Sequence, residues 1–328
     1  MNKEITKSII KRILSSLLVL FLLITFLFFL LRVSPGSPYQ KFVSPELSPK
    51  LSSLVKESFY LNSSLLDQYK SFVINLIQGN FGISYTYRIP VIVVIKKYLP
   101  FTLIFSLTSF VIQISIGFFL ALLSVKKING QLDSAISKTS LAIYSLPSFV
   151  IGVSLIFIFS NWLNFLPSSG LNSFDFNSYT FIGKIADYTT HMILPLVTLS
   201  LGGIIIFYKY LRDNLVEVYN KSFVENLRMH GFTEKEITGK HVIPNAISPI
   251  ISVAGVELGL LFGGALITEV IFSLPGMGRL TVNAILSRDY PLVVGCTFIA
   301  GILVIITNLA ADLIKAKLDK RLVKGIIN

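Results

Sequence analysis

Strongly polar side chains are rare inside the long apolar runs of this sequence, and two of them could do chemistry there. Glu257 interrupts the apolar run 242–268, and Gln113 interrupts the run 101–125. A carboxylate within a membrane span costs on the order of a few kcal/mol unless it is paired, protonated or wetted. Glu257 therefore indicates either a polar path for a cationic or amino-bearing solute, or a hydrogen bond to a neighbouring helix, for which Gln113 is a candidate partner.

Motifs for catalysis are missing from the sequence. It contains no H-E-x-x-H or G-x-S-x-G pattern and no G-x-x-x-x-G-K-[ST] loop that would cradle ATP. Its one cysteine, Cys296, cannot form an internal disulfide, and His230 and His241 do not by themselves predict a metal site. Because a single intramembrane carboxylate does not supply acid–base chemistry, we expect no enzyme activity and no metal or cofactor bound by this chain.

The elements that carry these residues are predicted to be membrane-spanning helices. Of the 328 residues, 53% are hydrophobic and 14% are charged, and the mean hydropathy is +0.73. Soluble domains carry about 25% charged residues, whereas about 20 apolar residues cross a bilayer as a helix. The sequence predicts an all-α integral membrane protein whose six spans are 13–31, 101–125, 139–166, 192–208, 242–268 and 291–311.

The distribution of positive charge predicts the orientation of these spans. The net charge is +12, and 18 of the 29 Lys and Arg residues lie in the segments 1–12, 126–138, 209–240 and 315–324. Three lie in short loops on the other side, and eight lie in the long segment 32–98. Because short cytoplasmic loops are rich in Lys and Arg, we expect both termini in the cytoplasm. Topology then explains much of the charge without nucleic acid.

The predicted cytoplasmic loop 209–241 interleaves charges of both signs. Its segment 222–230 has helical character, Gly231 can end a helix, and Thr233 with Glu236 fits the capping box of a second helix. By pattern alone this is a solvated charged loop, or else a helix–turn–helix that meets a partner beneath the membrane.

The spacing within and after this loop resembles a known family. Glu225-x5-Gly231-x9-His241-x3-Asn245 is similar to the cytoplasmic coupling motif of ABC-importer permeases, and His followed by Asn-Ala is typical of the oligopeptide, dipeptide and nickel permeases. Ordered matches to this family cover nearly the whole chain: 68–69, 79–85, 194–195, 212 with 217, 263–265, 269–280, 284–285 and 288–291. The chain departs from the family at Leu227 and Met229, where small residues are usual, which indicates a matched groove on its ATPase.

The resemblance implies a type I ABC-importer permease fold and a function. The chain would be the permease subunit of an ATP-driven importer, forming half of the path for dipeptides or oligopeptides, with nickel or a metal chelate as the alternative solute. Its partners would be a second homologous permease subunit, two ABC ATPase subunits that hold ATP and Mg, an external solute-binding protein and the lipid bilayer. The membrane would be the plasma (inner) membrane of a prokaryote.

The resemblance also assigns roles to residues. Coupling to the ATPase would involve Glu225, Arg228, Gly231, Phe232, His241 and Asn245. The family's outer-loop motif corresponds to Pro275, Gly276, Gly278, Arg288, Asp289, Tyr290 and Pro291. Arg288 and Asp289 fit a structural corner before the sixth span, or a docking contact for the solute-binding protein.

Three glycines of the fifth span recur every fourth residue. Gly255, Gly259 and Gly263 form a ridge that lets helix backbones approach closely, either within this chain or across to a second permease. Glu257 points to the opposite face, because each residue turns a helix by about 100°.

The chain is expected to divide into a tail and first anchor at 1–31, an extracytoplasmic segment with short helices at 32–98, a transmembrane domain at 99–314 containing the coupling loop 209–241, and a cytoplasmic tail at 315–328. The sequence does not contain the motifs expected of a membrane-embedded enzyme. It also does not show the inverted repeats that are expected of a secondary transporter. Both are therefore weaker readings than the permease.

Overall fold

The structure, a computed structural model, describes residues 3–33 and 64–318. Five helical stretches in this part of the chain are long and apolar enough to cross a membrane. They are α1 (Lys3–Val33), α4 (Val91–Val125), α7 (Phe181–Tyr219), the consecutive helices α11 (Ser248–Gly264) and α12 (Leu266–Ile271), and α14 (Tyr290–Leu318). No strand forms within the described ranges, which agrees with the predicted all-α class.

The third predicted span, 139–166, is not one straight helix. The chain instead forms α5 (Gln131–Tyr144) and then α6 (Ser148–Leu155), which continues as the π-helical η2 (Ile156–Trp162), and the two parts are bent by 97°. Pro147 explains the break, since proline has no backbone N–H to donate and disfavours helical geometry in the residue before it. Six spans are present only if this bent pair counts as one.

Several long helices extend beyond their predicted apolar spans, α1 and α14 among them. α4 begins ten residues before the predicted start of its span, and α7 begins 11 residues early and also continues through Lys209 and Arg212 to Tyr219. Hydropathy marks the part of a helix that lies in hydrocarbon. Lys, Arg and Glu are good helix formers, so a helix does not have to end where its apolar run ends.

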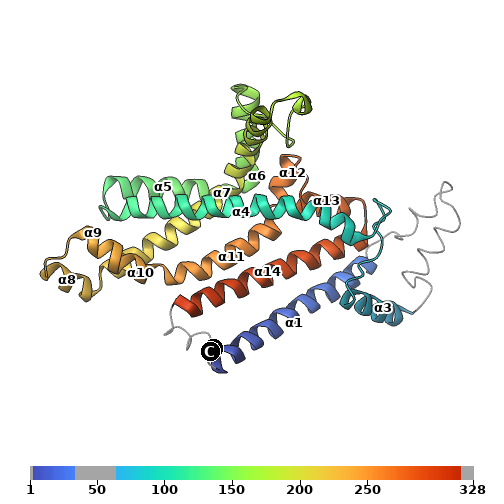
Figure 1. Cartoon of the computed structure of the whole chain (residues 1–328), viewed down its shortest axis with the longest axis horizontal. Coiled ribbons are helices and arrows are strands. Elements are labelled where there is room, and N and C mark those ends of the chain that lie inside the picture. Colours follow the sequence, from blue (N-terminus) through green and yellow to red (C-terminus); the bar gives the residue numbers. More distant parts are fainter. Residues whose placement is uncertain (1–2, 34–63, 319–328) are drawn as a thin grey trace.

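The long helices pack as pairs (Figure 1). α4 lies along α7, α11 lies along α14, and α1 covers the outer side of α14. An ion pair joins α1 to α14, with Arg12 Nε 2.8 Å from Asp312 Oδ2. Figure 1 shows α6 rising from the bundle, where it packs against α7 and α12.

Short helices lie at the two ends of the bundle. At one end, here the α8 end, are α8 (Ser222–Met229), α9 (Glu234–Glu236), the π-helical η4 (Ile237–Val242) and α10 (Ile243–Ala246). At the other, the α13 end, are α3 (Leu65–Ile77) and α13 (Met277–Leu286). α3 is one of the short helices expected in 32–98, and Tyr69 on it hydrogen-bonds Thr25 of α1 at 2.9 Å. The rest of that segment up to residue 63, and the tail after 318, lie outside the described residues.

Candidate functional site

The turn after α8 is built around Gly231. Its φ is +83°, and its N–H donates to the carbonyl of Arg228 at 3.0 Å while the N–H of Phe232 donates to Leu227 at 3.2 Å. This pair of bonds is a Schellman helix end, which favours glycine because the left-handed conformation disfavours side chains. Within the described chain, no atom lies within 4 Å of the place where a Cβ would stand, so the turn is open to a partner.

Exposed side chains pair across this turn. Arg228 Nε donates to Glu234 Oε1 at 2.6 Å, and this hydrogen bond lowers the pKa of the Glu234 carboxyl and raises the pKa of Arg228. Glu225, one turn before Arg228, is also exposed. Both members of the pair keep about half or more of their side-chain surface in solvent, so the pair sets geometry more than stability.

The second half of the motif folds back on the first. The predicted capping box is present, with the Thr233 hydroxyl accepting from the N–H of Glu236 and the Glu236 carboxylate accepting from the N–H of Thr233. The Phe232 ring meets the edge of the His241 ring at 5.9 Å, and Asn245 Nδ2 donates to the His241 carbonyl at 2.7 Å. The structure thus gathers Phe232, His241 and Asn245 on one side of the turn.

The turn at Gly231, together with the helices α8 and α9 on either side of it, is called the α8 turn below. Buried apolar side chains attach it to the bundle. Val224, Ile237 and Val242 are fully buried in one cluster with Leu215 of α7 and Ala121 of α4. The α8 turn is therefore packed directly on α4 and α7 through a close-packed interior. The sequence signal for these contacts is the set of apolar residues that stand between the charged residues of the loop 209–241.

A buried ion pair near this end was missed by sequence reasoning. Arg212 of α7 donates from Nε and Nη2 to Asp133 of α5 at 2.9 and 2.7 Å, and the Asp133 side chain is 3% exposed. Asp133 also accepts from the Ser124 hydroxyl and from the N–H of Asn129. The pair fixes the α4–α5 corner to α7. Arg212 lay within the family match, but nothing in the sequence indicated its partner 79 positions away.

The two predicted path residues do not meet. The Gln113 side chain is buried between α4 and α7, where Nε2 donates to Ser109 Oγ at 3.3 Å and to the Leu199 carbonyl at 3.2 Å. A Cβ at Gly203 would overlap this amide. The hydrogen bond between Gln113 and Glu257 that the sequence left open is therefore not formed.

Glu257 is half-buried on α11, and its carboxylate makes no hydrogen bond or ion pair with any described residue. Gly255 and Gly259 face α14, where Cβ atoms would meet Ala311 and Thr307. Glu257 lies on the other side of the helix. The third glycine of the ridge, Gly263, has open space around it rather than a neighbouring helix.

Glu269 organises the predicted outer-loop motif, although sequence reasoning gave it no role. Its fully buried carboxylate accepts from the Thr102 hydroxyl at 2.7 Å and from the N–H of Arg279 at 3.0 Å. Gly276 and Gly278 permit this approach, because a Cβ at either would overlap the carboxylate or the backbone of Leu266. A negative charge at the start of α13 also complements the helix dipole.

The other end of α13 holds a second buried carboxylate. Asp289 is fully buried and accepts from Ser84 Oγ at 2.5 Å, the N–H of Thr86 at 2.9 Å and the N–H of Leu292 at 3.3 Å. It therefore caps α14 and ties down the segment before α4, as a structural corner would. Of the motif residues, Pro275, Gly276 and Gly278 lie at the start of α13, and Arg288, Asp289, Tyr290 and Pro291 follow its end.

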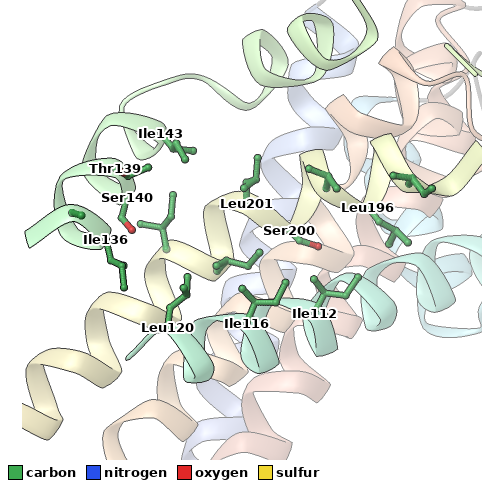
Figure 2. A pocket seen from close by; sticks show the side chains of 15 residues that line it. Ile112, Ile116, Leu120, Ile136, Thr139, Ser140, Ile143, Leu196, Ser200 and Leu201 are labelled. Carbon is green, nitrogen blue, oxygen red and sulfur yellow. The ribbon is translucent and has the colours of Figure 1, made fainter. Parts of the chain in front are cut away.

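A pocket of about 680 Å³ opens between α4, α5 and α7. Figure 2 shows Ile112 and Ile116 of α4 and Ile136 and Ile143 of α5 facing it. Ser200, Ser140 and Thr139 add hydroxyls, but no charged side chain lines it. In the described chain no group of three or more His, Cys, Asp and Glu residues could hold a metal ion either.

Comparison with models of known protein families identifies the family of this chain. The family model described as binding-protein-dependent transport system inner membrane component matches residues 113–324, and the model for the N-terminal part of such components matches residues 5–108. The chain belongs to this family. It is a permease subunit of an ABC importer, a class in which ATP hydrolysis resides on separate subunits, and it is an integral membrane protein.

Individual relatives agree with this assignment. The nickel import system permease protein NikB of Staphylococcus aureus strain USA300 is 32% identical over 97% of this permease and 92% of its own length, and that of strain MRSA252 is 33% identical over the same shares. Among solved structures, an inward-facing MetNI methionine ABC transporter matches with a TM-score of 0.53 at 18% identity, covering 70% of this chain and 97% of its own. An amino acid ABC transporter matches with a TM-score of 0.52 at 16% identity, covering 68% and 94%. At these identities the structures support the type I fold.

Proposed function

We propose that this permease forms half of a translocation path for a cationic or amino-bearing solute, with dipeptides or oligopeptides as the main class. A second homologous permease supplies the other half, two ATPase subunits supply ATP and Mg, and an external solute-binding protein delivers the solute. The α8 end faces the cytoplasm of a prokaryotic cell, with both termini on that side of the plasma membrane. The uneven distribution of Lys and Arg supports this orientation.

The α8 turn is the proposed ATPase contact. This proposal is supported by the open space beside Gly231 and by the buried cluster that contains Val224, Ile237 and Val242. An exposed turn fixed on a packed base can be pushed without being deformed. Closure of the ATPase pair would therefore move α4 and α7 as rigid bodies.

One observation carries the choice of solute. Glu257 has no partner among the described residues, and it lies on the face of α11 opposite the glycines that pack on α14. An unpartnered carboxyl group in a span is stable where it is protonated or where water or a cation reaches it, and a translocation path supplies water and a passing cation. The ammonium group of a peptide meets that requirement.

Nickel is the second candidate solute, because the nickel import permeases of S. aureus match 97% of this chain. A divalent cation, or a chelate with net positive charge, would also be attracted by Glu257. A single carboxylate does not hold a metal in place, so such an ion would pass rather than bind.

Uptake measurements separate these solutes. Cells that depend on this permease would be given a labelled dipeptide or labelled nickel, with Glu257→Gln as the test variant and Glu217→Gln as the control. Glu217 of α7 is an exposed carboxylate that pairs with Lys221, the residue before α8. We expect Glu257→Gln to reduce uptake of the positively charged solute about tenfold and the control to match the wild type. Unchanged rate and selectivity in Glu257→Gln would refute the path assignment, and failure of the permease to co-purify with an ATPase would refute the assembly.

A further inference from the structure

A cleft opens at the α8 end of the bundle, between the end of α4, the end of α7 and the helices α8, α9 and η4. Its volume is about 830 Å³, which lies within the range of pockets that hold small ligands. It shares the Arg228–Glu234 pair with the α8 turn, but Gly231, Phe232 and His241 do not line it. It is called the α4–α9 cleft below.

The lining of the α4–α9 cleft has an apolar part and a charged part. Leu122, Val125 and Ile243 form the apolar part, and they belong to or pack against the buried cluster beneath the α8 turn. The charged part consists of Lys126, Arg228, Lys235 and Glu234. Such a lining suits a molecule that has an apolar tail and an anionic head.

Positive charge in the cleft remains available to a ligand. Glu234 pairs with Arg228, with Oε1 2.6 Å from Nε. Lys126 and Lys235 are exposed and form no ion pair with a described residue. The segments outside the described ranges carry more Lys and Arg than Asp and Glu, so overall they add positive charge to the protein. An anionic group is therefore attracted to the two lysines.

Lys126 lies at the level of the lipid headgroups. The uncharged stretch 101–125 of α4 is about 38 Å long at about 1.5 Å per residue. The hydrocarbon core of a bilayer is about 30 Å thick, and the bilayer with its headgroups is about 40–45 Å thick. Because Lys126 directly follows this stretch, the cleft adjoins the headgroup layer. Leu122 lies on the hydrocarbon side of Lys126.

The walls of the cleft are held in place without a ligand. A hydrogen bond between the hydroxyls of Tyr219 and Thr238 joins α7 to η4, and Val125 of α4 is buried. Gly239 lines the cleft and leaves room in it, since no described atom lies within 4 Å of the place where a Cβ would stand. A site that is formed before binding loses little entropy when a ligand enters.

We infer that the α4–α9 cleft binds an anionic phospholipid, with the phosphate of the headgroup near Lys126 and Lys235 and an acyl chain along Leu122 and Ile243. This inference rests on the proposed function, because it takes the α8 end to face the cytoplasm. Basic pockets between membrane-spanning helices on the cytoplasmic side bind anionic lipid headgroups. The bound lipid joins the base of the α8 turn to the membrane.

Lipid binding to the purified complex in detergent tests the inference. The permease, with its partner permease and ATPases, would be titrated with dioctanoyl phosphatidylglycerol in a calorimeter. Dioctanoyl phosphatidylcholine, which has no net charge, and glycerol 3-phosphate, which has no acyl chain, are the comparison probes. The charge variant is Lys126→Gln with Lys235→Gln. Its control is Lys138→Gln with Lys209→Gln, which neutralises two exposed cations of α5 and α7 outside the cleft.

A second variant changes the shape of the cleft and not its charge. Gly239→Leu places a side chain in the open space of the cleft. The matched control is Gly202→Leu on α7, where a Cβ also meets no described atom within 4 Å and which does not line the cleft.

We expect the charge variant and Gly239→Leu each to weaken the binding of phosphatidylglycerol about tenfold, and each control to change it less than about twofold. Phosphatidylcholine should bind the wild type at least about tenfold more weakly than phosphatidylglycerol. Wild-type affinity in either cleft variant overturns the inference. So does glycerol 3-phosphate binding as tightly as the lipid, since the occupant would then be a free phosphate compound.

The orientation that the inference takes from the proposed function is tested separately. Lys138→Cys would be treated with a membrane-impermeant maleimide added to intact cells. We expect no labelling, and Cys296 adds little background because it is buried. Labelling from outside would refute the proposed orientation, whatever the complex binds in detergent.

Discussion

The turn at Arg288 that follows α13 is called the α13 corner below. The α8 turn and the α13 corner end their helices with the same pair of backbone hydrogen bonds, yet they are stabilised differently. At the α8 turn the left-handed position is Gly231, where a Cβ would meet no described atom within 4 Å. At the end of α13 it is Arg288, although a side chain there costs roughly 1–2 kcal/mol. The next residue, Asp289, is buried and accepts three hydrogen bonds. The corner that is held by its own chain carries a strained residue, whereas the turn proposed as the ATPase contact has glycine at the same position.

The charges of the two regions differ in the same way. Arg228 and Glu234 pair in solvent at the α8 turn, while Glu269 and Asp289 are fully buried at the two ends of α13. Buried carboxylates that accept from backbone and hydroxyl donors organise the fold. Exposed pairs remain available to exchange partners. The α13 corner is therefore expected to respond to mutation through stability, and the α8 turn through coupling.

The largest expected effect is at Glu269. Glu269→Ala would leave the Thr102 hydroxyl and the N–H of Arg279 buried without an acceptor, and we expect a loss of about 3–5 kcal/mol in folding stability. The measurement is thermal unfolding of the purified complex in detergent. Glu269→Gln keeps the size and one acceptor and should lose less. Equal stability of Glu269→Ala and wild type would contradict the structural role.

Asp289→Ala is expected to have the next largest effect, about 2–4 kcal/mol, because it frees Ser84 and the backbone donors of Thr86 and Leu292. Hydrogen exchange should rise first in the segment 83–90. The matched control is Asp175→Ala, which removes an exposed carboxylate from the connection between η2 and α7. If both variants exchange alike, Asp289 does not hold the corner.

At Gly231 the expected loss of stability is smaller. Gly231→Ala should cost about 1 kcal/mol, since only the left-handed backbone resists the methyl group. Gly231→Trp should insert and fold similarly but occupy the open space, so that ATP is hydrolysed without uptake. Uptake and hydrolysis measured on the same vesicles check this. Wild-type uptake by Gly231→Trp would refute the coupling assignment.

The smallest expected effect is the pH dependence of the Arg228–Glu234 pair. The pKa of Glu234 is lowered in the folded protein, so the pair stabilises the turn above the ordinary Glu pKa, and this is lost as pH falls through the lowered value. Solvent screening keeps the contribution under about 0.5 kcal/mol. The change in unfolding temperature between pH 7 and pH 4 should therefore be almost the same in the wild type and in Glu234→Gln. A large difference between the two would mean that the pair is a main source of stability.

Local rules predicted the α8 turn well, because its signals are short in range. The helix over 222–230, its stop at Gly231 and the capping box at Thr233 all follow from residues within a few positions of each other. The break at Pro147 was also a local signal, but continuous hydropathy across it outweighed the proline. Helix ends were misplaced wherever a helix continued past its apolar run.

Contacts over long distances in sequence could not be predicted. Glu269 lay inside a matched motif, yet its partner Thr102 is 167 positions away. Asp133 and Arg212 are ordinary charged residues until folding removes them from water. No periodicity or spacing in a single chain indicates which buried charge meets which donor.

The contact between Gln113 and Gly203 has a mechanical consequence. With the amide of α4 filling the space that a side chain on α7 would need, the two helices cannot slide past each other, and they turn together as one lever. Pro195 interrupts the hydrogen bonding of α7, so the straight arm is the part from Pro195 to Tyr219, about 37 Å long at about 1.5 Å per residue. A tilt of about 5° about one end of this arm would carry the other end about 3 Å. A small rotation at the α8 turn would thus become a displacement of several ångströms further along α7.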